Sequence, residues 1–400
     1  MPEQFLHGIE VLNIDEGVRP IRTPKSSVIG LVGTAPKADA QLFPLNTPIL
    51  IAGSQREAAK LGSMGTLPKA INGIFEQTGA VVVVVRIAEE DDNDKSKNKD
   101  EEKNKSTLAN LLSSTIDEQG HYQGLKALYD ANSIVKVTPR ILIAPGFSHQ
   151  QEVATALNSI AERLRAIAII DGPNSTDSAA ISYRQQFGSS RLYLVEPWVK
   201  VFNPQTAKSE AEPASARVAG LIAKIDAEQG FWYSPSNHEI LGITGTARPI
   251  DFILGDSNAR ANLLNEREVV TIIQQNGYRL WGNRTCSSDP KWAFLSVRRT
   301  ADMINDALLE SHLWAIDRNI TKTYLEDVTE GVNAYLRQLM QQGAILGGQC
   351  WADPELNTAT QLQEGKVTFD FDFTPPTPAE HITFRSHLVN DYFGTVFDSQ

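Results

Sequence analysis

Cysteine is scarce in this chain, which contains only Cys286 and Cys350 among its 400 residues. Two cysteines cannot build a disulfide framework, which excludes a small disulfide-stabilised scaffold, and an intracellular pair is expected to be reduced. Long apolar runs are also missing. No stretch approaches the roughly eighteen residues of a transmembrane helix, and the first residues lack the regions of a signal peptide. We therefore expect a protein that is made in the cytoplasm and does not insert directly into a membrane.

Positive charge is in the minority as well. The 37 Lys and Arg residues face 48 Asp and Glu residues, which gives a formal net charge of −11. Contacts along a phosphate backbone need concentrated positive charge, so nucleic acid is not an expected partner. The length and the 41% hydrophobic composition predict a globular protein of two or three domains with a substantial core.

Motifs for catalysis or cofactor binding are absent too. The chain has no Gly-x-Ser-x-Gly elbow and no His-Glu-x-x-His. In 30–37 and 62–69 a proline separates the glycines from the lysine, which favours turns over phosphate loops. His381 and His387 would lie about 20 Å apart in a strand, too far to share a metal. Cys286 stands near an arginine that would lower its pKa, but a buried, inert thiol is the favoured interpretation. We predict no catalytic, cofactor-binding or metal-binding residues.

The first half of the chain has the pattern of an α/β domain. Short apolar runs predict buried strands, and a helical pattern covers 150–166. The predicted strands are 28–32, 81–85, 141–144, 167–170 and 192–195. Because the run of five valines at 81–85 leaves no polar face, it suits a strand covered by helices on both sides. The economical prediction is a mainly parallel sheet.

A highly charged segment at 89–105 interrupts this domain. It contains eight acids, five lysines and no apolar side chain. Such a composition predicts a mobile, solvated loop that faces outward. A calcium or partner site is the less favoured alternative, since the spacing lacks the glycine of an EF-hand loop.

The last third changes to amphipathic helices. Val297, Ala301, Ile304, Leu308 and Ala315 recur at helical spacing. For a second helix, Thr323 and Glu326 are placed as a capping box and Gly343 as the stop. Its predicted inward residues are Val328, Val332, Leu336, Leu339 and Met340. These helices lead into terminal strands, which predicts an α+β unit.

The C-terminal residues alternate as two strands. Val367, Phe369, Phe371 and Phe373 share one face of the first, and Ile382, Phe384 and Leu388 share one face of the second, with Arg385 opposite. Pro375, Pro376 and Pro378 lie between them and hold a stiff, extended connection. The pattern alone fits equally an intramolecular hairpin and a strand donated to a neighbouring subunit.

The N-terminal residues offer a counterpart. Ile9, Val11, Leu12 and Ile14 form a short, imperfect strand pattern. Pro20 and Pro24 follow and favour an extended segment. Since chain ends usually fray, a strand pattern at both ends suggests two arms that need a partner to cover them.

Several long blocks carry a family resemblance. Residues 263–292 read LLNEREVVTIIQQNGYRLWGNRTCSSDPKW, and the part at 277–285 closely resembles the contractile tail sheath proteins of temperate myophages and R-type bacteriocins. Other blocks look like members of that family in the same order: FLHGIEVLNIDEGVRPI at 5–21, PRILIAPG at 139–146, LRAIAIIDGPNSTD at 164–177, SPSNHEILGITGTARPIDF at 234–252 and HLWAIDRNITKTYLEDVTEGVNAYLR at 312–337. The resemblance covers nearly the whole chain, except for the charged segment at 89–105.

The resemblance implies a structural protein rather than an enzyme. Members polymerise into a helical sheath around an inner tail tube, and the extended sheath later contracts to drive the tube through a bacterial envelope. The implied partners are further copies of the chain, the inner tube protein, and baseplate and sheath terminator proteins. No cofactor is implied. The implied location is the cytoplasm of the producing bacterium during assembly, then a released phage tail or bacteriocin particle.

The resemblance also implies an organisation in which terminal arms add strands to the sheets of neighbours. We expect an N-terminal arm at 1–24, an outer α/β domain at 25–255 with a mainly parallel sheet, an inner α+β assembly domain at 256–378 and a C-terminal arm at 379–400. The predicted arm strands contain Ile9, Val11, Leu12, Ile14, Ile382, Phe384, Arg385 and Leu388; the acceptor strand contains Val367, Phe369, Phe371 and Phe373; and the hinges are Pro20, Pro24, Pro375, Pro376 and Pro378.

The residues also provide candidate tube contacts and fit two competing functions. Arg298 and Arg299 are the candidate tube contacts, although the residues alone favour their pairing with Asp302 and Glu310 on a solvated helix face. One competing function is a soluble α/β enzyme with a ligand at the carboxyl ends of its strands, near 146 or 171. The other is a structural tube or capsid subunit that does not contract.

Overall fold

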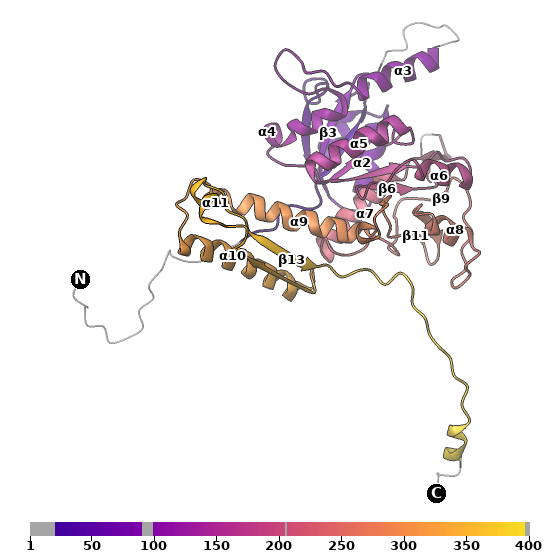
Figure 1. Cartoon of the computed structure of the whole chain (residues 1–400). Helices are drawn as coiled ribbons and strands as arrows, with labels where there is room; N and C mark the ends of the chain where they lie inside the picture. The colour runs from indigo at the N-terminus through magenta and orange to yellow at the C-terminus, as the bar shows by residue number, and fades with distance from the viewer. Residues whose placement is uncertain (1–20, 90–98, 205, 397–400) are drawn as a thin grey trace, which may run out of the picture.

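The computed structural model describes residues 21–89, 99–204 and 206–396, and its main body is built on a six-stranded sheet (Figure 1). The strand order is β2-β3-β1-β4-β5-β6, and every neighbouring pair is parallel except β2 with β3. The strands are β1 (Ile29–Thr34), β2 (Pro48–Ala52), β3 (Val81–Ile87), β4 (Ile141–Ile143), β5 (Ile167–Asp171) and β6 (Leu192–Val195). The predicted mainly parallel sheet is confirmed. The edge strand β2 was not predicted.

Helices cover both faces of this sheet, as the all-apolar strands require. Alternate residues of each strand enter two separate hydrophobic clusters. One cluster holds α2 (Thr66–Phe75) and α7 (Ser215–Glu228), and the other holds α5 (Gln151–Leu164) and α6 (Asp177–Arg184). Shorter helices of the body are α1 (Gln55–Ala58), α4 (Ala131–Val135) and α8 (Arg260–Glu266). None of the helices in the described ranges combines the length and apolar composition needed to cross a bilayer.

The charged segment at 89–105 was predicted to be a loop, but part of it is helical. Helix α3 (Lys99–Leu111) begins inside it, so 99–105 is helical, while 90–98 lies outside the described residues. The helix is anchored at its other end, where Leu111 is completely buried in the core. A charged sequence can continue a helix whose last turn is held by packing, because most helical stability in proteins comes from tertiary contacts.

Residues 259–295 pack with the α/β body, although the expected boundary at 255 assigned them to the second unit. Val270 extends the sheet beyond β6, since Glu196 N–H donates to its carbonyl at 2.9 Å and its own N–H donates to Leu194 at 3.0 Å. Val270, Ile272, Leu280 and Leu295 all belong to the body's clusters. Residues 259–295 contain the hairpin of β10 (Thr271–Gln274) and β11 (Tyr278–Trp281). Earlier in the chain, β7 (Val199–Asn203), β8 (Lys208–Glu212) and β9 (Gly245–Thr246) form a separate small sheet.

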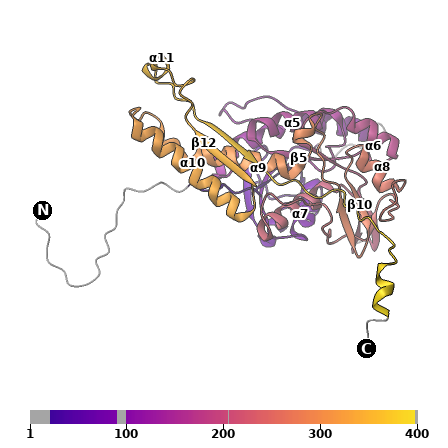
Figure 2. The ribbon, with the colours of Figure 1, turned by 60° about the horizontal axis from the view of Figure 1, so that its bottom comes forward.

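A second unit, built from two long helices and a hairpin that contains a short helix, projects from the body (Figures 1 and 2). It comprises α9 (Leu295–Ser311), α10 (Lys322–Gln342), β12 (Gly347–Trp351), α11 (Ala359–Gln363) and β13 (Asp370–Thr374). Its own cluster contains Ile304, Val332, Leu336 and Leu339. Gly343 ends α10 with φ of 77°, as predicted.

Two details of the helix predictions are wrong. Thr321, not Thr323, caps α10, since its hydroxyl accepts from Tyr324 N at 3.1 Å. Met340 was predicted to face inward but is 38% exposed. The helix therefore starts two residues earlier than predicted, and it faces a narrower core than its apolar pattern indicates.

Helix α9 is held against the body by ion pairs of two buried aspartates, which we call the α9 clamp (Asp302, Asp306, Arg140, Arg165 and Arg191). Each arginine stands one or two residues before one of the parallel strands β4, β5 and β6. Arg191 binds Asp302 at 2.7 Å, and Asp306 binds Arg140 at 2.8 Å and Arg165 at 2.6 Å. The helix therefore lies across the amino edge of the sheet.

Candidate assembly interface

The C-terminal segment leaves the protein surface after β13 (Figures 1 and 2). Its described part contains no β-strand beyond Thr374, although the alternation at 382–388 predicted one. Ile382 is 66% exposed, Phe384 91% and Leu388 100%. Three large apolar side chains in water are unfavourable, by roughly 1.5–3 kcal/mol each relative to burial. The predicted hairpin between 366–374 and 382–388 is therefore not formed within the described residues. The tail has the sequence of a strand but pairs with no strand there.

The root of this tail is fixed to the body. Glu380 accepts from Arg284 Nη2 at 2.7 Å and from Nε at 3.0 Å, and the same guanidinium lies 5.1 Å from the centre of the Phe294 ring. Both charged side chains are 37% exposed, so the pair adds little stability. It sets the direction in which the tail departs, just after the predicted hinge prolines Pro375, Pro376 and Pro378. Sequence reasoning missed this pair, because nothing in the pattern links residues 96 positions apart.

The predicted acceptor strand lies in the hairpin of the second unit. β13 pairs with β12 in antiparallel register, with Cys350 opposite Phe371. Phe371 and Phe373 stack at 5.9 Å and, with Phe369, pack against the cluster of α9 and α10. Val367 shares this half-buried face, while the alternate residues face solvent or are half-buried. The apolar face is as predicted, but the assigned strand starts at Asp370 instead of Lys366.

Two asparagine side chains form hydrogen bonds with backbone groups of this hairpin. Asn333 of α10 donates to Cys350 O at 3.0 Å and accepts from Cys350 N at 2.8 Å. Asn357 makes the same two bonds to Thr368, both at 2.8 Å. Each side-chain amide thus makes the two hydrogen bonds that a residue of a neighbouring strand would make. Neither was predicted, and an isolated asparagine in a helix pattern gives no signal for this role.

These bonds define which edge of the hairpin is open. Cys350 turns its backbone groups away from β13 and toward α10, so the edge of β12 is occupied there. On β13, Thr374 O accepts from Leu346 N, so Thr374 faces β12. Backbone groups alternate along a strand, so those of Phe371 and Phe373 point to the opposite edge. Within the described ranges no strand pairs with that edge.

Replacing Asn333 by alanine is expected to destabilise the chain by about 1–3 kcal/mol, because two backbone groups of the buried Cys350 lose their partners. Urea unfolding followed by circular dichroism measures the change. Gln338→Ala on the exposed face of the same helix is the matched control and should stay within about 0.5 kcal/mol of the wild type. Equal midpoints for the two variants would contradict the role given to Asn333.

The N-terminal arm residues Ile9, Val11, Leu12, Ile14 and Pro20 lie outside the described residues. The first described residues enter at the second unit. Ile21 is buried in its cluster, and Thr23 Oγ1 lies 2.8 Å from the hydroxyl of Tyr335 on α10. Residues 21–23 are therefore packed on the second unit, which carries the hairpin.

The candidate tube contacts are engaged within the subunit. Arg299 is 5% exposed and binds Asp226, with Nη1 and Oδ1 2.7 Å apart. Arg298 binds Asp302 at 2.7 Å, as the alternative predicted, and lies over the Trp292 ring at 4.3 Å. Arg299 does not pair with Glu310. Both arginines are thus paired within the single subunit, and a contact of either with an inner tube stays a prediction.

The carboxyl edge of the sheet carries a cavity of about 200 Å³, where the enzyme alternative would place a ligand. Its charged lining residues are paired within the chain: Lys69 with Glu210 at 3.0 Å, and Arg217 with Glu212 at 2.9 Å. Nearby Asp171 is fully buried, and burial raises its pKa. It accepts from the hydroxyls of Ser148 at 2.9 Å and Ser215 at 2.6 Å, which joins the end of β5 to α7. The arrangement is that of a structural brace.

Among the residues that the structure describes, no group of three or more His, Cys, Asp or Glu side chains could hold an ion. His381 and His387 lie in the exposed tail.

Both cysteine thiols are buried, and burial raises the pKa of Cys286 to about 12 and that of Cys350 to about 11. Arg284, which the sequence placed near Cys286, binds Glu380 instead. Native thiols should therefore react with iodoacetamide at pH 8 at least about a hundredfold more slowly than in urea, since only the thiolate is nucleophilic. Mass spectrometry of alkylated peptides measures both rates. A native thiol as reactive as the unfolded one would contradict this.

Comparison with known proteins gives consistent matches over most of the chain. Residues 120–286 match the family model of the phage tail sheath protein central domain, 287–388 match the phage tail sheath C-terminal domain, and 26–87 match the domain III N-terminal region of the tail sheath protein Gp18. A putative prophage major tail sheath protein of Pseudomonas aeruginosa (strain UCBPP-PA14) is 46% identical over 98% of this chain and 99% of its own length. The tail sheath protein of Escherichia phage P2 is 39% identical over 99% of this chain and 98% of its own.

Solved structures share the fold at low sequence identity. The helical sheath of the anti-feeding prophage in its contracted state has a TM-score of 0.70 at 18% identity, covering 95% of this chain and 98% of that chain. The sheath complex of the extracellular contractile injection system PVC, also contracted, has a TM-score of 0.68 at 17% identity, covering 97% and 99%.

Proposed function

Because this chain belongs to the phage tail sheath protein family, it is a structural subunit of a contractile injection system, and we propose that it polymerises into a helical cylinder around an inner tube. In this proposal the cylinder assembles extended and later contracts, driving the tube through a bacterial envelope. A repeated head-to-tail contact whose rotation does not close generates such a helix. We assign the chain a structural role and no enzymatic one.

The observation that carries the proposal is that the C-terminal part of the chain contains both an unpaired strand edge and an exposed segment with the sequence of a strand. The hairpin offers an open edge on β13, and the tail exposes Ile382, Phe384 and Leu388 at strand spacing. We propose that the tail of one subunit adds to the hairpin sheet of a neighbour, with Arg385 on the opposite face. Residues 9–14 at the N-terminus would add a further strand. Backbone pairing would then hold subunits together while the bodies rotate about the proline segments at Pro24 and at 375–378.

We further propose the arrangement of the units in the cylinder. The α/β body forms the outer part, and the second unit with its hairpin forms the inner, assembly part. The inner tube would contact this second unit. Baseplate and sheath terminator proteins would bind the two ends of the polymer, which would be built in the cytoplasm of the producing bacterium.

The energy for contraction is proposed to be stored at assembly. Two packings of the bodies that differ by about a few kcal/mol per subunit would suffice once summed over a long polymer. The extended cylinder would then be a kinetically trapped state, released from one end.

Electron microscopy of the purified full-length chain, alone and co-expressed with its tube protein, tests this function. We expect long hollow cylinders, wider and shorter when the tube is absent or has been driven out. A discrete closed oligomer would support the enzyme alternative. A single lattice under all conditions would support a tube that does not contract. Either result would overturn the proposal.

A further inference from the structure

The C-terminal tail is attached to the molecule at two places before its exposed part begins. The first is the end of β13 at Thr374, in the hairpin of the second unit. The second is Glu380, whose carboxylate accepts three hydrogen bonds of 2.7–3.0 Å from Arg284 of the body. The segment 375–380, which contains the three predicted hinge prolines, therefore bridges the two units. We call the Arg284–Glu380 pair the arm latch.

The body holds its half of the arm latch in a fixed position. Arg284 and Phe294 form a β-bridge, and the flanking segments 283–285 and 293–295 are joined by backbone hydrogen bonds of 2.8 and 3.0 Å. The guanidinium also lies 5.1 Å from the centre of the Phe294 ring. The place of the cation is therefore set by the body and does not depend on the tail, so a bound Glu380 has one position.

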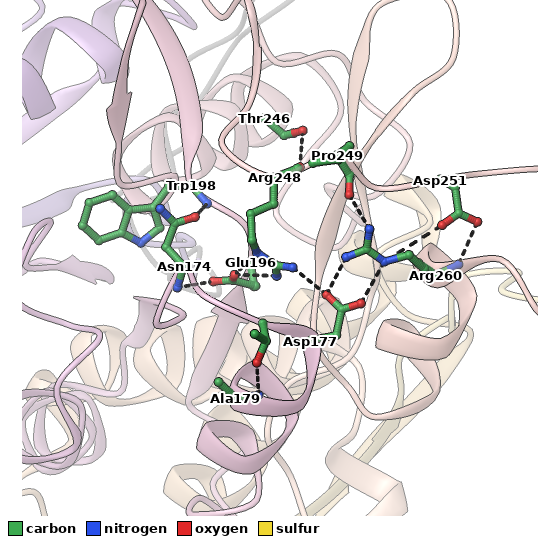
Figure 3. A network of polar contacts seen from close by, with 11 residues as sticks. Asn174, Asp177, Ala179, Glu196, Trp198, Thr246, Arg248, Pro249, Asp251 and Arg260 are labelled. Carbon is green, nitrogen blue, oxygen red and sulfur yellow. Dashed lines mark hydrogen bonds and ion pairs between the residues drawn. The ribbon is translucent and has the colours of Figure 1, made fainter.

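The arm latch differs from the ion pairs that fasten the body. In the network of Figure 3, Arg248 binds Glu196, which is fully buried, and Asp177, both at 2.7 Å. Arg260 binds the same aspartate at 2.8 Å. Opening that network would leave a buried carboxylate without a cation, which is strongly unfavourable. Both side chains of the arm latch are 37% exposed, so water can replace each partner and the latch can open while the body stays folded.

The state of the arm latch sets how much free chain precedes the predicted arm strand. That strand begins at Ile382, so with the latch closed only His381 lies between a fixed residue and the strand. One residue spans at most about 3.6 Å. With the latch open, the free segment is 375–381, which reaches roughly 25 Å when extended. Opening therefore lengthens the connection about sevenfold without breaking a backbone pair of the hairpin.

We propose that the arm latch is a length switch for the C-terminal arm, closed in one lattice of the polymer and open in the other. This inference rests on the proposed function, because it needs subunits that stay linked by strand addition while their bodies move. When a body moves by more than a few ångströms relative to the neighbour that holds its arm, His381 alone cannot span the change. An added strand has several hydrogen bonds and the latch is a single exposed pair, so the latch opens first.

Chemical locking of the arm latch tests this switch in the polymer. The variant Arg284→Cys/Glu380→Cys is joined by a short bismaleimide, and the same variant capped with N-ethylmaleimide is the matched control with an open latch. The native Cys286 and Cys350 are buried and should not react. We expect the locked chain to form cylinders of one lattice only, which stay unchanged in a urea pulse that converts wild-type cylinders. The capped chain should form cylinders that convert.

The outcomes separate this inference from the proposed function. Locked cylinders that convert as the wild type does would overturn the inference alone. So would a locked chain that forms no cylinders, because the closed direction of the arm would then belong to neither lattice. A capped chain that forms no cylinders or only one lattice would do the same, since an open latch should allow both. A wild-type chain with a single lattice under all conditions would overturn the proposed function as well.

A second measurement uses the single full-length subunit. Spin labels at Ser386→Cys on the tail and Glu152→Cys on α5 report the direction of the tail through their distance. We expect a narrow distance distribution at low salt, at least about twice as broad in Glu380→Gln and in about 1 M NaCl, which screens exposed charges. Glu330→Gln is the control, since its pair with Arg337 is also exposed but lies within α10. Equal distributions for the two variants would show that the arm latch does not hold the tail.

Discussion

A chain that ends at Pro378 is expected to fold normally but to lose polymerisation, with the required concentration raised at least about a hundredfold. The deleted residues 379–400 include Ile382, Phe384 and Leu388, which are exposed in the single subunit and would be buried on a neighbour. Strand addition supplies several hydrogen bonds of about 0.5–1.5 kcal/mol net each, and each apolar side chain adds about 1.5–3 kcal/mol. Ordering the arm offsets part of this. A remainder of about 3 kcal/mol already corresponds to a hundredfold.

Sedimentation and electron microscopy of the truncated chain measure the effect. Its thermal midpoint should match that of the full-length chain, because the truncation removes the exposed Arg284–Glu380 pair, which adds little stability. Phe384→Ser/Leu388→Ser in the full-length chain separates side-chain burial from backbone pairing and should give an intermediate defect. Cylinders of normal length from the truncated chain would show that the tail is dispensable and that strand donation is not what connects subunits.

Replacing Asp302 by alanine is expected to destabilise the subunit by about 3–5 kcal/mol. Asp302 is 1% exposed and binds both Arg191 and Arg298 at 2.7 Å. Its loss leaves two guanidinium groups in a buried interface without this carboxylate, and removing one partner of a buried pair costs much more than the intact pair contributes. Since the α9 clamp joins the second unit to the body, the loss should affect the unfolding of both together.

Chemical denaturation monitored by circular dichroism gives the change in unfolding free energy. Lys322→Ala is the control, because its pair with Glu326 is 3.6 Å long and the lysine side chain is 90% exposed, so its removal should change little. Asp302→Asn keeps the shape and some hydrogen bonds, and should fall between the wild type and the alanine variant. A destabilisation of Asp302→Ala below about 1 kcal/mol would show that the clamp does not hold the two units together.

The sequence predicts the body well because its strands are apolar on both faces. All five predicted strands are present within a few residues of their expected bounds. The antiparallel edge strand β2 was missed, since a short run that begins with Pro48 resembles a loop. The charged helix α3 was missed because its stability comes from the buried end at Leu111, which composition does not show.

The assembly site is only partly visible in the sequence. Period-two alternation identified the apolar face of β13 and the unpartnered tail, because that pattern is local. The Asn333 bonds, the Arg284–Glu380 pair and the α9 clamp depend on residues that meet only in the fold. An arginine stands one or two residues before each of β4, β5 and β6, and this repetition, together with Asp302 and Asp306 one helical turn apart, is the signal that would have suggested the clamp.

The asparagine at the rim of the hairpin has a consequence for the life of the unassembled subunit. A small sheet with two unpaired edges could add strands from further copies without limit, as amyloid does, while subunits accumulate before a particle is nucleated. Because Asn333 binds both backbone groups of Cys350, the edge of β12 is covered there, and a further strand can pair only along β13. If neighbouring arms add to β13 as proposed, growth of the sheet would end once they are bound, and unassembled subunits would be protected from fibre formation along β12.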